Sequence, residues 1–166
     1  MISAGVRQLA CRGEEMSALL VICGFTIALP MEALTIWPDM AAKTIIKPAQ
    51  SAPAVGPYNH AVRIGDFLFC AGQIPLDPAT GNLVSGDIKA QTQRVLENVK
   101  AILDDQKLTF ANVVKSTVFL TNLADFAGMN EVYARYFTTD FPARSTIQVA
   151  ALPKGASVEI EVIAHF

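Results

Sequence analysis

Two positions near the end of the chain carry the side chains best suited to chemistry. Arg144 directly precedes the β-prone run 145–149, and Glu159 lies within a second β-prone run, 157–162. A guanidinium binds a small carboxylate through paired hydrogen bonds, each worth roughly 1.5–3 kcal/mol when water is excluded. A carboxylate can hold or activate a water molecule. We therefore interpret the rest of the chain as the frame that brings these two groups together.

Each of the two residues also has a plainer interpretation. Pro142 favours an extended backbone before Arg144, so we expect the arginine at the start of a strand, as a surface charge or in a structural ion pair. In the run 157–165, apolar residues alternate with Glu159 and Glu161. Two carboxylates about 6.6 Å apart on one strand face are costly to bury unpaired. That face is therefore either exposed to solvent or part of a wet cleft shared with Arg144.

The composition argues against several kinds of partner. The 166 residues are 52% hydrophobic, which favours one domain with a sizeable core. With 13 basic and 15 acidic residues and no basic run, the chain is a poor candidate for binding nucleic acid. The cysteines and histidines show no metal-binding or disulfide pattern; they are Cys11, Cys23, Cys70, His60 and His165. We expect a metal-free site in a cytoplasmic protein with no membrane partner, and Cys70 as a small buried strand residue rather than a nucleophile.

Residues 1–39 differ in character from residues 40–166, which we treat as the main domain. The run 17–29 is apolar for 13 residues. This is short of the roughly 20 residues that span a bilayer, although it suits the apolar core of a secretory signal. Three interpretations stay open: a dispensable extension or misassigned start, with the natural chain beginning at Met40; a signal or anchor; and a packed structural segment.

The next stretch predicts strands and a stiff loop. Residues 43–46 form a short strand candidate, and residues 61–71 predict a β-hairpin that turns at Gly65-Asp66. Three prolines stiffen the loop 48–57, so the following Tyr58 would be held in place. Gly72 ends the hairpin, where it either lets a ligand approach the backbone or marks a bulge.

Two helices follow from the apolar spacing. Asp87 is the expected N-cap of the first, which runs to about Gln106, and Asp125 is the expected N-cap of the second. Their apolar stripes, which we assign to the core, are Val95, Leu96, Val99, Ile102 and Leu103, then Phe126, Met129, Tyr133, Tyr136 and Phe137. Asn130, beside the second stripe, is a solvated residue unless the start of that helix lines a pocket.

The order of these elements, with a further β-branched strand at 113–120, predicts the fold. We expect an α/β (α+β) fold with a mixed sheet of about six strands and both helices on one face, joined by right-handed crossovers. The opposite face, carrying Phe119 and Ile147, would need its own cover, which self-association would supply.

Several motifs, in the right order, closely resemble those of the RidA (YjgF) imine deaminases. They are Gly56-Pro57-Tyr58, Ala71-Gly72-Gln73-Ile74-Pro75, 98–102, 114–119, 141–145, 149–154 and Glu159-Ile160-Glu161. The resemblance covers residues 41–166 and does not touch residues 1–39. It implies a chorismate-mutase-like fold and a homotrimer whose sheets form a central barrel, with three clefts between subunits.

The resemblance also implies roles for particular residues. The residue matching Arg144 grips the substrate carboxylate, and the residue matching Glu159 orients the attacking water. The residues matching Tyr58, Gly72 and Asn130 line the cleft. The implied reaction is cofactor-free hydrolysis of 2-imino acids, which pyridoxal-phosphate-dependent threonine and serine dehydratases release, to 2-oxo acids and ammonia.

Two departures and two rival functions remain beside this interpretation. Ala71 stands where the family often has serine, and Thr146 stands where many bacterial members have cysteine. One rival is a non-catalytic trimer that binds small carboxylates or acts like a chaperone. The other is an endoribonuclease or translation inhibitor, against which the acidic charge balance argues.

Overall fold

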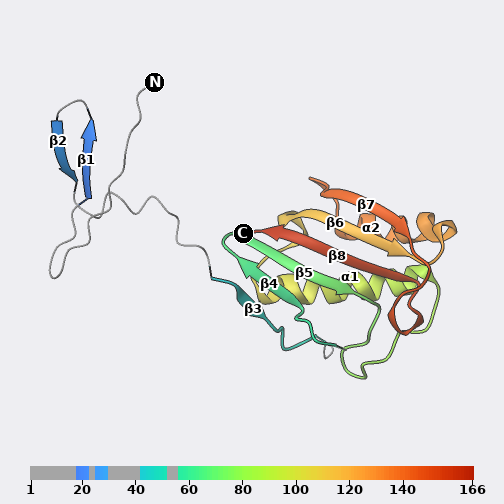
Figure 1. Cartoon of the computed structure of the whole chain (residues 1–166). Coiled ribbons are helices and arrows are strands. Elements are labelled where there is room, and N and C mark those ends of the chain that lie inside the picture. The colour runs from blue at the N-terminus through green and yellow to red at the C-terminus, as the bar shows by residue number, and fades with distance from the viewer. Residues whose placement is uncertain (1–17, 23–24, 30–41, 52–55) are drawn as a thin grey trace. The chain divides into compact units, whose positions relative to one another are not determined.

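The structure is a computed structural model that describes residues 18–22, 25–29, 42–51 and 56–166 (Figure 1). The chain divides into two compact units, residues 1–41 and 42–166. In the first unit, strands β1 (Ala18–Ile22) and β2 (Phe25–Leu29) pair in antiparallel fashion. Whether this unit is an extension, a signal or a structural segment stays a prediction. Among the described residues, no helix has both the length and the apolar character needed to cross a membrane.

The second unit is built on a six-stranded mixed sheet in the order β3-β4-β5-β8-β6-β7. All neighbouring strands are antiparallel except the parallel pair β6 and β7. The strands are β3 (Thr44–Ile46), β4 (Ala61–Ile64), β5 (Phe67–Gln73), β6 (Val113–Leu120), β7 (Ala143–Gln148) and β8 (Val158–His165). The predicted α+β architecture is therefore confirmed, with the last strand of the chain inside the sheet between β5 and β6.

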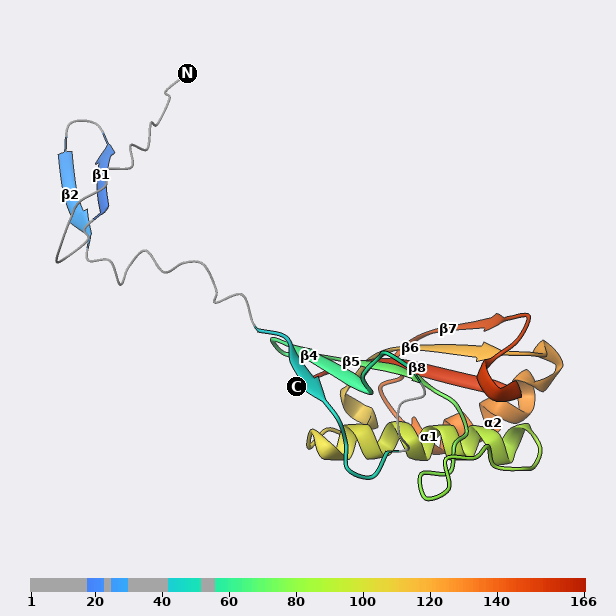
Figure 2. The ribbon, with the colours of Figure 1, turned by 60° about the horizontal axis from the view of Figure 1, so that its bottom comes forward.

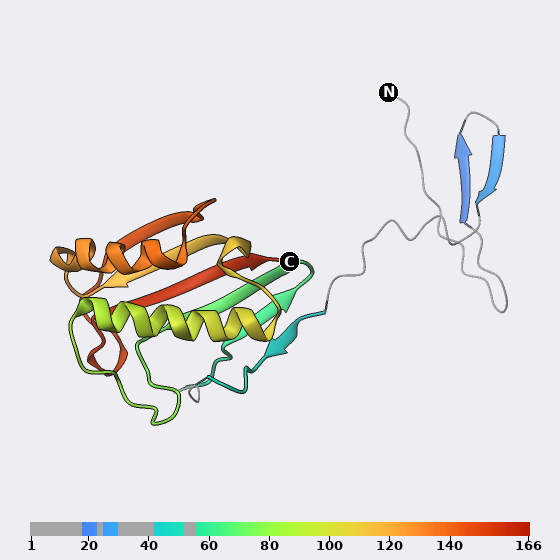
Figure 3. The same ribbon diagram turned by 180° about the vertical axis from the view of Figure 1, so that it is seen from behind.

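Both helices, α1 (Ile88–Asp105) and α2 (Phe126–Tyr136), cover the same face of the sheet (Figures 2 and 3). Asp87 caps α1 as predicted, because its Oδ1 accepts the backbone N–H of Ala90 at 2.9 Å. The α1 stripe is buried against the strands, with Leu96 and Leu103 fully inaccessible. This interface is the core of the domain.

The start of α2 differs from the prediction. Asp125 occupies the N-cap position but makes no side-chain capping hydrogen bond. Instead, Asn122 Oδ1 accepts the N–H of Ala124 at 3.0 Å and caps the short 3-10 turn η3 (Leu123–Asp125) that leads into the helix. The prediction that the Asp125 side chain caps the helix is therefore wrong, because the capping hydrogen bond is made three residues earlier, by Asn122.

The opposite face of the sheet has no helix over it within the described part of the chain (Figure 2). Large apolar side chains are exposed there: Phe67 is 43%, Phe69 44% and Ile147 47% accessible. Phe119, the other residue predicted on this face, is half-buried. Exposed apolar surface of this kind marks interaction sites in soluble proteins, so self-association through this face stays a prediction.

A β-bulge interrupts the pairing of β5 with β8. Cys70 is opposite Val162 and Gln73 is opposite Ile160, so two residues of β5, Ala71 and Gly72, span one position of β8. Bulges bend a strand and redirect its backbone. Gly72 therefore lies in a bulge, and the bend sets the direction of the backbone beside Glu159. The approach of a ligand to this backbone stays a prediction.

Candidate functional site

Arg144 lies on β7, next to Ser116 of β6 in the parallel ladder. Its guanidinium carbon is 4.6 Å from the ring centre of Tyr133 and 5.7 Å from that of Phe126, both on α2. A guanidinium within about 6 Å of an aromatic face is attracted by the ring quadrupole. The arginine therefore extends along the helix-covered side of the sheet, and two rings of α2 hold it there.

No ion pair among the described residues involves Arg144. The structural ion pair considered from the sequence is thus not seen in this part of the chain. The half-buried guanidinium borders a cavity of about 450 Å³. The other lining residues are Asn130, Tyr133, Ala134, Phe141 and Pro142. Within the described part of the chain no carboxylate pairs with its N–H donors, so an anion in this cavity could bind them.

Glu159 extends from the open face of β8, opposite Phe119 of β6. Its carboxyl group packs directly over Gly72: a Cβ at that position would lie 2.8 Å from Glu159 Cδ and 3.0 Å from Cγ. Glu159, Gly72 and Tyr58 border a groove of about 240 Å³, whose other lining residues are Ala71, Ile74 and Pro153. The missing side chain at Gly72 is what makes room for the carboxylate.

The two glutamates of β8 have different environments. Glu161 is exposed, as a solvent-facing strand residue should be, whereas Glu159 is half-buried. Burial raises the pKa of the Glu159 carboxyl above its usual value, and the negative charge of Glu161 raises it further. A carboxylate with a raised pKa is a stronger base, which suits a group that takes a proton from water.

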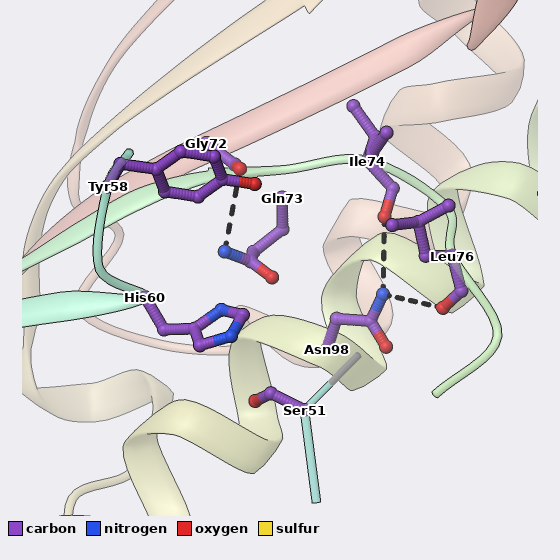
Figure 4. A pocket seen from close by; sticks show the side chains of 8 residues that line it. All are labelled: Ser51, Tyr58, His60, Gly72, Gln73, Ile74, Leu76 and Asn98. Atoms are coloured by element: carbon purple, nitrogen blue, oxygen red, sulfur yellow. Dashed lines mark hydrogen bonds between the residues drawn. The ribbon is translucent and has the colours of Figure 1, made fainter. Parts of the chain in front are cut away.

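Two buried or half-buried amides fix the backbone behind Gly72 (Figure 4). Gln73 Nε2 donates to the carbonyl oxygens of Ala71 at 3.0 Å and Gly72 at 3.4 Å. Asn98 Nδ2, on α1, donates to the carbonyl oxygens of Ile74 at 3.2 Å and Leu76 at 2.9 Å. The Asn98 bonds anchor the segment 71–76 to α1 at Ile74 and Leu76, while the Gln73 bonds stay within the segment, and together they hold the backbone of the groove in one position.

Cys70 does not provide a nucleophile. Its side chain is buried, and this burial raises the pKa of the thiol to about 12. The thiolate, which is the reactive form, is therefore scarce at neutral pH. The assignment of Cys70 as a small buried strand residue fits this environment.

The predicted site residues form two separate groups in one chain. Tyr58 and Gly72 lie with Glu159, and Asn130 lies with Arg144. Asn130 therefore lies at a pocket, which is the second of the two positions predicted for it. Arg144 and Glu159 are not brought together, because they project from opposite faces of the sheet and β6 lies between their strands.

Sequence reasoning missed the residues that support each group. The sequence predicted Tyr133 as a core residue only. Gln73 and Asn98 lay within the quoted motifs, but no role was predicted for either. The usable signal for the two amides was that polar side chains capable of two hydrogen bonds stand beside Gly72 and within an apolar helix stripe.

Known proteins share this fold. The model of the endoribonuclease L-PSP family matches residues 49–166. The chain belongs to this family. The RidA (YjgF) resemblance seen in the motifs is thereby confirmed, since relatives of this L-PSP family include proteins with RidA and deaminase names.

Three of these relatives show how far the similarity extends. Protein DfrA of Myxococcus xanthus is 54% identical over 125 residues, which are 74% of this chain and 95% of that protein. The human 2-iminobutanoate/2-iminopropanoate deaminase is 43% identical over 122 residues, which are 74% of this chain and 89% of that protein. RidA from an Antarctic Psychrobacter superposes with a TM-score of 0.72 at 43% identity, covering 74% of this chain and 99% of the other.

Proposed function

We propose that this L-PSP family member hydrolyses small 2-imino acids to 2-oxo acids and ammonia. The observation that carries the proposal is the Arg144 guanidinium, which aromatic rings hold beside a cavity while no described carboxylate pairs with it. An arginine kept in this way is suited to a carboxylate that arrives from outside. The name of the human relative, an imine deaminase at 43% identity, supports the same reaction.

The reaction follows from the groups in the two halves of the site. Arg144 binds the substrate carboxylate, and the backbone near Gly72 holds the nitrogen end. Glu159 accepts a proton from water as the water oxygen bonds to the C=N carbon. The proton then passes to nitrogen, which gives a carbinolamine. As the C–N bond breaks, the carbinolamine hydroxyl loses its proton to nitrogen, so the carbonyl forms and nitrogen leaves as ammonia. General acid–base help of this kind contributes ~10²–10⁴-fold, which is enough for imines that already hydrolyse in water.

The proposed active site requires more than one protomer. Arg144 and Glu159 face opposite sides of the sheet, so one chain cannot place both on a three- or four-carbon substrate. A ring of identical subunits would set the Glu159 groove of one protomer against the Arg144 cavity of the next. We propose a homotrimer, with the exposed Phe67, Phe69 and Ile147 buried at its centre.

The test couples a threonine dehydratase to the full chain and follows 2-oxobutanoate formation against trapping of the imine by semicarbazide. We expect Arg144→Ala to abolish the acceleration and Glu159→Gln to weaken it greatly, with both variants folded. Arg135→Ala is the matched control, because Arg135 is an exposed arginine paired with Glu131. Acceleration at the wild-type rate by both site variants would refute the assignment.

The rival functions predict different results in the same experiment. A non-catalytic carboxylate-binding trimer would need Arg144 for binding but would tolerate Glu159→Gln. A ribonuclease, the activity in the name of the family, would cleave RNA even with Arg144→Ala. The net charge of −2 weighs against an RNA substrate.

A further inference from the structure

Tyr133 contacts two residues, Ser116 and Arg144, that lie side by side on neighbouring strands of the sheet. Its nearly buried ring, 4% accessible, lies 4.6 Å from the Arg144 guanidinium carbon. Its hydroxyl forms a 2.7 Å hydrogen bond with the hydroxyl of Ser116, which is fully buried. Ser116 and Arg144 are direct neighbours across the β6 and β7 ladder. Tyr133 therefore extends from α2 over the point where the arginine leaves the sheet.

Neighbouring rings fix the plane of the Tyr133 ring. It stacks on Phe137 with centres 4.2 Å apart and an angle of 16°. Phe110 packs edge-on against Phe137 at 4.9 Å and 74°. A ring stacked on one side and hydrogen-bonded at its tip cannot swing away from Arg144 without breaking both contacts.

This arrangement matters because arginine is a long and flexible side chain. Holding it in one orientation costs free energy, because the side chain loses rotamer entropy. If the free protein has already ordered the side chain, a ligand does not lose that free energy on binding. The phenol also stays neutral, since burial raises the pKa of Tyr133, although the Ser116 hydrogen bond and the charge of Arg144 oppose the shift. Tyr133 is thus a fixed aromatic surface rather than a source of protons.

We propose that Tyr133, locked by Ser116, is a positioning residue that orients the Arg144 guanidinium for a small planar carboxylate. The inference rests on the proposed function in one respect, that Arg144 binds the substrate carboxylate. Tyr133 itself need not touch the reacting atoms.

The test compares variants of the full chain by calorimetric binding of 2-oxobutanoate and by kcat and KM in the coupled assay. For Tyr133→Leu we expect Kd and KM to rise about tenfold with kcat within about twofold, because the carboxylate contact is equal in ground and transition states. For Tyr133→Phe and for Ser116→Ala we expect Kd and KM to rise about threefold. The double variant should show no further rise, because each change removes the hydrogen bond between Ser116 and Tyr133.

Tyr136→Phe is the matched control, since Tyr136 is a half-buried tyrosine on the same helix that packs against Phe110. We expect it to leave Kd and KM unchanged. A folded Tyr133→Leu variant that binds 2-oxobutanoate like the wild type overturns the proposal, even if its melting temperature falls. If that variant does not fold, wild-type Kd values for Tyr133→Phe and Ser116→Ala overturn it instead.

Arg144→Ala separates this inference from the proposed function. If it binds 2-oxobutanoate as tightly as the wild type, the proposed function fails first. If it loses binding while Tyr133→Leu keeps it, Arg144 keeps its role and only the positioning role of Tyr133 is wrong.

Discussion

Arg144 and Glu159 project from opposite faces of one sheet, on strands β7 and β8 that are separated by β6. Each is surrounded by a different set of residues: aromatic rings of α2 around the arginine, and Gly72 with Tyr58 around the glutamate. Each half holds a reactive group that a hydrolase of small imino acids would use. One chain does not bring the two groups together, so the proposed activity depends on how protomers meet.

Gly72→Ala should lower kcat with little change in folding. The added methyl group would occupy the space of the Glu159 carboxyl, which would have to move aside. Because that carboxyl is the end of a flexible side chain, we expect a loss of stability under about 1 kcal/mol. Gly56→Ala is the control, since its methyl group would come no closer than 3.5 Å to the Tyr58 ring. Equal kcat in the two variants would show that the position of the carboxyl is unimportant.

Glu161→Gln should shift the acid limb of the pH–rate profile to lower pH. In the proposed mechanism Glu159 acts as the carboxylate, so the rate should fall as pH drops through its raised pKa. Burial is the larger cause of that raised pKa, and the charge of Glu161 is the smaller one. Removing the smaller cause lowers the pKa only in part. Measuring kcat/KM from pH 4 to 8 checks this, and an unmoved limb would contradict the coupling.

Glu159→Gln should make the protein more stable at neutral pH while it weakens activity. The folded pKa of Glu159 lies above its unfolded value, so the native state binds more protons between the two. Stability is therefore fully present below the unfolded pKa and falls as pH rises through the folded pKa. The glutamine of the variant does not ionise, so the variant does not lose stability at this position as pH rises. Thermal melts at pH 4 and pH 7 should show a gain for the variant only at pH 7.

Asn98→Ala should destabilise the domain by roughly 1–3 kcal/mol, because two backbone carbonyls lose their donor. Denaturant unfolding measures the loss. Gln93→Ala is a suitable control, since Gln93 is an exposed residue of α1 whose amide bonds only Glu97 in the described structure. If both variants unfold at the same denaturant concentration, Asn98 does not anchor the segment 71–76.

Much of the fold follows from local pattern. The α1 stripe, the hairpin turn at Gly65-Asp66 and the alternation of β8 are each set by residues close in sequence, and each is where it was predicted. The order of strands is not local, and nothing in residues 158–165 says that β8 lies between β5 and β6. Predicted features that fall on residues 52–55, within the proline-rich loop, lie outside the described residues.

The candidate site was harder to predict than the fold for two physical reasons. A stripe pattern shows that Tyr133 faces inward but not that its ring meets Arg144 at the edge of the sheet. On β8, buried apolar residues alternate with Glu159 and Glu161, so the sequence pattern indicates the face of Glu159. On β7 no residue is buried, so no such pattern indicates the face of Arg144. The separation of the two groups therefore appears only in three dimensions.

Subunit mixing tests most directly whether the site is shared between protomers. Arg144→Ala and Glu159→Gln chains are unfolded together, refolded at equal concentration, and assayed for imine hydrolysis beside each variant alone. In a randomly mixed ring, about a quarter of the interfaces would combine an intact Arg144 with an intact Glu159 of the neighbour. We expect the mixture to recover about that fraction of wild-type activity. A mixed assembly, verified by mass, that is no more active than the better single variant would contradict the shared site.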